Sequence, residues 1–143
     1  MAKALVVANW KMNPSSFKEA KKLFEATKRA AEGAKQSAVV VAPPALYLRE
    51  LAANYRGKKI SFAVQHAHFE AGGAYTGELS LPQAKDAKAS YVLIGHAERR
   101  AMGETNDDTQ KKVAAALALK LTPILCVGEK ERKHDGEHYD IVR

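Results

Sequence analysis

The stretch YVLIGHAERR, residues 91–100, decides the fold. Its four apolar residues predict a short buried strand, which stops at a glycine, and a histidine, a carboxylate and two guanidinium groups follow at once. A second segment, LVVANWK at residues 5–11, has the same layout. In α/β folds, ligands and catalytic groups lie at the carboxyl ends of parallel strands. The two segments therefore predict that two distant strands present polar groups at one end of a sheet.

Composition narrows the class of protein. The 143 residues suffice for one domain with a core, and the net charge of +7 comes from 23 basic and 16 acidic side chains. That charge could attract phosphorylated metabolites or nucleic acid, but solvated helix faces explain it better, because no aromatic-interleaved basic patch occurs. We expect no nucleic-acid partner. No apolar run approaches the roughly 20 residues of a membrane helix, so no membrane partner is expected.

The cellular setting follows from the cysteine count and the N-terminus. Cys126 is the only cysteine, which excludes a disulfide framework and fits a reducing cytoplasm. The first residues run directly into a strand-like segment without a small-residue cleavage site, so no signal peptide is expected. We predict a cytoplasmic protein in which this thiol serves packing.

Apolar runs alternate with helical patterns along the chain. Strands are predicted at 4–8, 38–42, 60–64, 91–94 and 122–127. Helices are predicted from a cap at Ser15 or Ser16 to Gly33, around 46–52, at 79–87, at 96–101, at 105–120 with Thr105 or Asn106 as cap, and from 137 onward. The repeat of strand and helix is that of βαβ units.

The strands are uniformly apolar, which predicts a parallel sheet covered on both faces. This leaves an open doubly wound sheet or a barrel, and the absence of a glycine-rich phosphate motif after the first strand disfavours nucleotide binding. Five strands are too few for an eight-stranded barrel. The sequence as printed stops within the helix predicted at 137–143, so an open sheet edge is expected.

Four segments in register point to one family. NWKMN at 9–13, GAYTGELS at 73–80, the stretch 91–100 and CVGE at 126–129 follow predicted strands one, three, four and five. Together they resemble triosephosphate isomerase. The resemblance implies a TIM (β/α)8 barrel of roughly 250 residues, of which this chain holds the first five or so βα units. It implies one partial domain over 1–143 that ends within the fifth helix.

The resemblance also implies a function. The family interconverts dihydroxyacetone phosphate and glyceraldehyde 3-phosphate, small phosphorylated trioses, through an ene-diolate and without a cofactor. It works as a homodimer. Two alternatives stay open. One is a non-catalytic half-barrel that assembles with itself or with a complementary C-terminal fragment, and the other is an unrelated open α/β ligand-binding domain.

By resemblance, three residues carry substrate chemistry. His96 matches the electrophile that polarises the carbonyl, as a neutral imidazole at a helix start. Lys11 matches the active-site lysine, whose point charge suits a phosphorylated substrate. Asn9 matches an asparagine that contacts substrate and can position the lysine. Without the resemblance, a strand-end histidine merely caps a helix, a loop lysine is merely solvated, and Trp10 is read as packing.

Further residues are assigned to support. Glu98, which we count with His96 and Lys11 among the catalytic residues, matches the carboxylate that pairs with the active-site lysine. Arg99 is expected to pair with Glu78 or Glu104. As plain surface ion pairs these would contribute about 0–1 kcal/mol. Thr76, at the tip of a glycine-rich loop, matches the residue that reaches the neighbouring subunit.

The remaining histidines invite a metal interpretation, which the spacing does not favour. The pairs are His66 with His68 and His134 with His138, and neither has a cysteine partner or a metalloprotease-type pattern. We predict no metal site.

Departures from the family pattern qualify the expectation. Ala97 stands where the family usually has a serine beside the base, and His66 stands where it usually has an asparagine or a similar small polar residue. The family's catalytic glutamate, its lid and its phosphate-binding amides follow strands six to eight, outside the printed sequence. Glu129 and Glu131 match other positions and are not assigned as the base. The chain alone is therefore expected to be inactive.

Overall fold

Five parallel strands form one sheet in the order in which they occur along the chain. The computed structural model describes residues 4–34, 36–129, 131, 134–136 and 138–139. The strands are β1 (Ala4–Asn9), β2 (Ser37–Ala42), β3 (Ile60–Val64), β4 (Tyr91–Ile94) and β5 (Thr122–Leu125). A doubly wound sheet reverses its strand order at a switch point, and this sheet does not.

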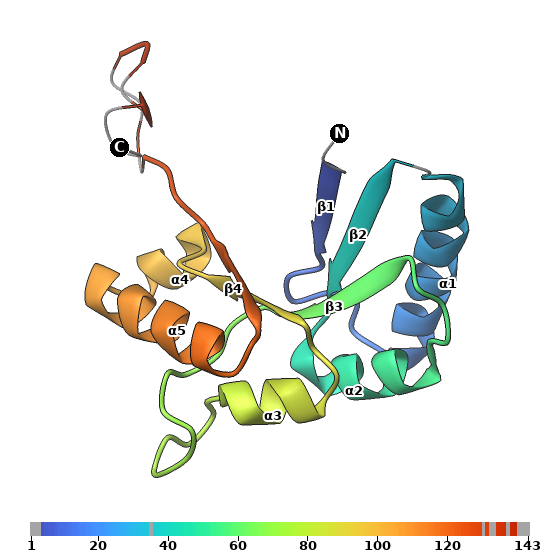
Figure 1. Cartoon of the computed structure of the whole chain (residues 1–143), viewed down its shortest axis with the longest axis horizontal. Coiled ribbons are helices and arrows are strands. Elements are labelled where there is room, and N and C mark those ends of the chain that lie inside the picture. Colours follow the sequence, from blue (N-terminus) through green and yellow to red (C-terminus); the bar gives the residue numbers. More distant parts are fainter. Residues whose placement is uncertain (1–3, 35, 130, 132–133, 137, 140–143) are drawn as a thin grey trace.

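The connecting helices lie around the outside of the curled sheet (Figure 1). They are α1 (Phe17–Gly33), α2 (Ala45–Asn54), α3 (Leu81–Asp86), α4 (Ala97–Ala101) and α5 (Asn106–Ala118). The result is a half-barrel, an incomplete TIM barrel. This confirms the predicted fold class, and the register aligns the carboxyl ends of all five strands at one rim.

Helix starts follow the predicted caps. Ser16, rather than Ser15, accepts a hydrogen bond from the Glu19 amide, and Thr105 accepts one from the Asp108 amide. The helix predicted at 79–87 is shorter, since Ser80 is its cap.

Element ends are less well predicted. The helix α5 ends at Ala118, before Lys120 adopts a positive φ of 59°. Strand β5 stops at Leu125, earlier than the predicted 127. Of the helix predicted from 137 onward, residues 137 and 140–143 lie outside the described residues.

Both faces of the central strands are apolar and buried, as predicted. Val39 and Val41 face the helices and pack in the larger core with Leu48. Val40 and Leu93 face the inside of the curl and form a smaller cluster. The alternation along β2 shows why its sequence is a continuous valine run.

The expectation of covered faces is wrong for the outer strands. Leu5 and Val6 of β1 are 47% and 50% exposed, and Leu125 of β5 is 49% exposed. The reason is that both lie on edge strands of the half-barrel, each with a neighbour on one side only. Among the described residues, no helix is long and apolar enough to cross a membrane.

Candidate active site at the carboxyl rim

Lys11, Glu98 and His96 meet at the carboxyl rim of the sheet. The Lys11 ammonium lies 2.7 Å from Oε1 of Glu98, and both side chains are more than half exposed. The hydrogen bond from Lys11 lowers the pKa of Glu98. The backbone amide of Glu98 in turn donates to Nδ1 of His96 at 3.3 Å. One glutamate therefore contacts both a cation from the β1 end and the imidazole from the β4 end.

The backbone of Lys11 is held from two sides. The Asn9 side chain accepts a hydrogen bond from the Lys11 amide at 2.9 Å, and Gln65 Nε2 donates to the Lys11 carbonyl and to the Ala42 carbonyl, both at 2.8 Å. These bonds sustain a φ of 54° at Lys11, a conformation that costs a residue with a Cβ roughly 1–2 kcal/mol. The predicted positioning of the lysine by Asn9 is present, and Trp10 packs against the core.

The contacts of His96 fix its tautomer. His96 is the N-cap of α4, so this histidine does cap a helix. Because Nδ1 accepts the Glu98 amide, the ring proton of the neutral imidazole is on Nε2. The Glu98 carboxylate is 3.6 Å from Nδ1, too far for a competing hydrogen bond. In the described part of the chain, the hydrogen bond of this ring is the one at Nδ1, which leaves the Nε2–H available to a ligand.

A cleft of about 1030 Å³ opens beside this histidine, between the residues that follow β4 and those that follow β5. His96, Ala97 and Arg100 line one side, and Cys126 lines the other. Burial raises the pKa of the Cys126 thiol, which keeps it protonated and fits the predicted packing role. The cleft has the place expected for a ligand in an α/β fold.

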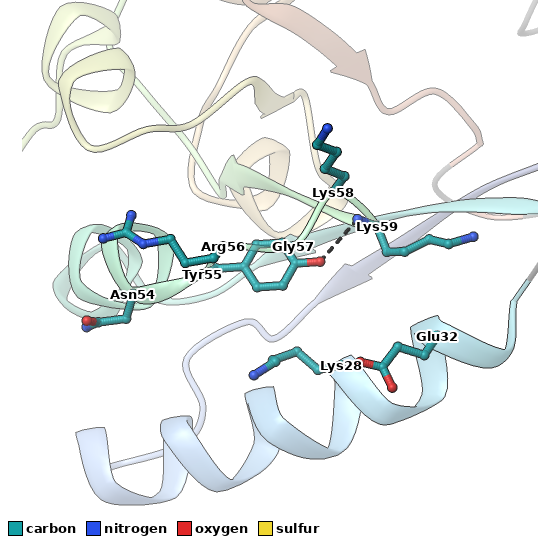
Figure 2. Close-up of a pocket in the computed structure, with 8 residues that line it drawn as sticks. All are labelled: Lys28, Glu32, Asn54, Tyr55, Arg56, Gly57, Lys58 and Lys59. Atoms are coloured by element: carbon teal, nitrogen blue, oxygen red, sulfur yellow. Dashed lines mark hydrogen bonds between the residues drawn. The ribbon is translucent and has the colours of Figure 1, made fainter.

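A second cleft, of about 430 Å³, lies at the opposite, amino end of β3. Figure 2 shows that its basic side chains, among them Arg56, Lys58 and Lys59, point in different directions and do not converge. The Tyr55 hydroxyl accepts the Lys59 amide at 3.1 Å, which makes this tyrosine a brace for the turn. The arrangement does not form a binding site for one small anion.

A nearly buried ion-pair network anchors the end of β4. Glu104 Oε1 accepts the Gly95 amide at 2.9 Å, and Oε2 accepts Lys112 Nζ at 2.9 Å. The Glu104 and Lys112 side chains are only 3% and 7% exposed. Arg99 approaches both predicted partners, Glu78 at 3.8 Å and Glu104 at 3.5 Å. Glu104 thus fixes the residue directly before His96.

Thr76 lies apart from this site. It is exposed, in the glycine-rich segment between β3 and α3, which extends away from the rest of the molecule (Figure 1). His68 stacks on Phe69 and on Tyr75, which orders the loop. The predicted subunit contact of Thr76 stays a prediction. Within the described ranges, no group of three or more histidine, cysteine or acidic side chains could hold a metal ion.

Comparison with known families agrees with this geometry. The family model for triosephosphate isomerase matches residues 4–143. The chain belongs to the triosephosphate isomerase family. The half-barrel is therefore a portion of the TIM barrel after which the fold is named, and the chemistry of this family is that of an isomerase.

Sequence reasoning missed two parts of this family member's site. The clamp from Gln65 to Lys11 spans 54 residues, and the tie from Glu104 to Gly95 depends on how α5 packs. The sequence does contain a signal for the buried position of Glu104. Lys112 falls in line with the buried residues Thr109 and Ala116 of α5. A charged residue on the apolar face of a helix indicates a buried counter-ion.

Proposed function

We propose that this chain supplies the electrophile-and-lysine half of a site that interconverts dihydroxyacetone phosphate and glyceraldehyde 3-phosphate through an ene-diolate. The observation that carries this is the contact of Glu98 with both Lys11 and His96. Through this contact, Glu98 holds the Lys11 cation and the imidazole of His96 at one rim, beside a cleft. The chain that carries them is a member of an isomerase family.

The chemistry follows from these two groups. When a base removes the proton from the carbon beside the carbonyl, the electron pair moves toward the carbonyl oxygen and charge develops there. The Nε2–H of His96 donates to that oxygen, and the interaction strengthens as the charge grows. The Lys11 ammonium stabilises the phosphate and the ene-diolate. Asn9 keeps Lys11 in place through its amide.

The base is proposed to come from outside residues 1–143, since the family's glutamate follows strand six. It would come from a continuation of this polypeptide or from a complementary C-terminal fragment. We call the assembly of residues 1–143 with strands six to eight the completed enzyme. We further propose that it acts in the cytoplasm as a homo-oligomer, with Thr76 in the subunit contact.

An isomerase assay tests the proposal. Residues 1–143 are assayed alone and after addition of a polypeptide that carries strands six to eight. Activity should arise only in the mixture, and His96→Gln should abolish most of it, whereas His134→Gln, at an exposed histidine, should not. If the mixture that carries His96→Gln were as active as the unchanged mixture, the electrophile role of His96 would be refuted.

The alternative is a non-catalytic half-barrel that assembles with itself or with another chain. The exposed apolar side chains of both edge strands favour it. It predicts a stable complex with the complementary fragment but no turnover. The same mixing experiment therefore separates the two functions.

A further inference from the structure

His66 links both ends of the glycine-rich loop to the body of the half-barrel. It follows β3 at the start of the loop, and its Nε2 lies 2.5 Å from Oε2 of Glu78 near the loop's end. Its Nδ1 lies 3.4 Å from Nζ of Lys112 on α5. The imidazole is 20% exposed. One ring therefore ties residues 66 and 78 to each other and to a helix.

Four charged groups face this ring, one from each element packed against it. Glu78 belongs to the loop, Arg99 to α4, Glu104 to the turn before α5, and Lys112 to α5. The charges of the two carboxylates and the two cations cancel without a charge on the ring. Lys112 and Arg99 both contact Glu104, at 2.9 and 3.5 Å. The ring is thus accommodated in its neutral form.

The neutral ring uses both of its nitrogens. An ammonium can only donate, so Nδ1 accepts from Lys112, and the ring proton is on Nε2, which donates to Glu78. A second proton would be on Nδ1 and would face the ammonium at 3.4 Å. Lys112 cannot withdraw at low cost, because it is nearly buried and bonded to Glu104. Protonation of His66 therefore breaks the contact with Lys112 and creates a repulsion there, although the attraction to Glu78 and Glu104 opposes this effect.

We propose that His66 is a proton-sensitive latch, which holds the loop of residues 66–78 against α5 at neutral pH and releases it in mild acid. Burial lowers the pKa of His66, and the charges of Lys112 and Arg99 lower it further, against the opposing hydrogen bond with Glu78. A depressed histidine pKa means that the latched state is fully stabilised above the free value of about 6.5. That stabilisation is lost as the pH falls through the pKa that His66 has in the latched state.

Release would loosen the segment that carries Thr76 and the Gln65 clamp on Lys11. Two amides inside the loop report on its closure. The His68 amide donates to the Leu79 carbonyl at 2.7 Å, and the Glu78 amide donates to the Tyr75 carbonyl at 3.0 Å. Both are protected from solvent exchange only while the loop keeps this shape.

The test is NMR on the full 143-residue chain between about pH 5 and 8, where histidine titrates. The His66 ring should titrate below about 6.5, and exchange of the two amides, corrected for its intrinsic pH dependence, should accelerate in acid. The acceleration should approach about tenfold for each pKa unit of depression. His66→Asn should remove the pH dependence, whereas His134→Asn, at an exposed histidine, should retain it.

Glu78→Gln supplies an independent variant. It removes the charge that favours the protonated ring, so release should require a lower pH than in the wild type. Identical pH dependence of exchange in wild type and His66→Asn would overturn the latch. So would a ring that titrates at its ordinary value while the loop amides stay protected.

Discussion

Replacing Lys112 with methionine tests how strongly the ion pair beneath the site stabilises the fold. The Lys112 and Glu104 side chains are 7% and 3% exposed, and their charged atoms are 2.9 Å apart. Methionine keeps the length of the side chain but removes the cation nearest to the buried Glu104 carboxylate, which then keeps Arg99, at 3.5 Å. Breaking one partner out of a buried pair costs about 3–5 kcal/mol. Because Arg99 and the Gly95 amide still contact Glu104, the free energy of unfolding should fall by at most that amount.

Lys111→Met is the matched control on the same helix. Lys111 pairs with Asp107 at 2.7 Å, but the two side chains are 51% and 68% exposed. An exposed pair at this spacing contributes far less to stability than a buried one. The two variants make the same chemical change at adjacent positions, one at a buried ion pair and one at an exposed pair. Lys111 also lies 5.3 Å from the centroid of the Phe69 ring, so its replacement removes that cation–π contact as well.

The assay is urea unfolding followed by the fluorescence of Trp10, the only tryptophan, which packs against the core. The double variant Lys112→Met with Glu104→Gln completes a cycle. It should lose less stability than the sum of the single variants, because neither charge is then left unpaired. Equal small losses for Lys111→Met and Lys112→Met would refute the reasoning, and the network would then be an incidental contact.

Three further outcomes are expected. In the completed enzyme, His96→Gln should lower mainly kcat. Lys11→Ala should also raise KM, because the phosphate is charged in the bound substrate as well as in the transition state. Steady-state kinetics separate the two effects. Ala97→Ser should raise kcat by up to about tenfold if a hydroxyl there positions the base, and an unchanged rate would show that the departure is neutral. Residues 1–143 alone should associate rather than run as a monomer of 15.6 kDa in analytical ultracentrifugation.

The sequence predicts what depends on local pattern. Short apolar runs located the strands. Ser80 and Thr105 located helix starts, because capping needs only neighbours a few residues away. The pair of Lys11 with Glu98 came from the resemblance, since composition and spacing alone leave a surface lysine unassigned.

What the sequence does not predict depends on packing between distant segments. Whether Arg99 meets Glu78 or Glu104 stayed open, and the structure places it within 4 Å of both, because His66 brings the two carboxylates to one place. The burial of β1 was overestimated for a similar reason. An apolar strand shows that its faces suit a core, but its position in the sheet decides whether a neighbour covers them.

The association expected of residues 1–143 follows from that exposure. Leu5 and Val6 on β1 and Leu125 on β5 leave apolar surface in solvent at both edges of the sheet, next to unpaired backbone groups. A second copy could cover the apolar surface, but a complementary fragment with strands six to eight would also supply paired edges on both sides. Its complex should therefore be the tighter one. Leu5→Lys should weaken both associations, whereas Leu46→Lys, at an exposed position on α2, should weaken neither. If residues 1–143 sedimented as a single sharp monomer peak and also unfolded cooperatively, the open half-barrel would be stable on its own.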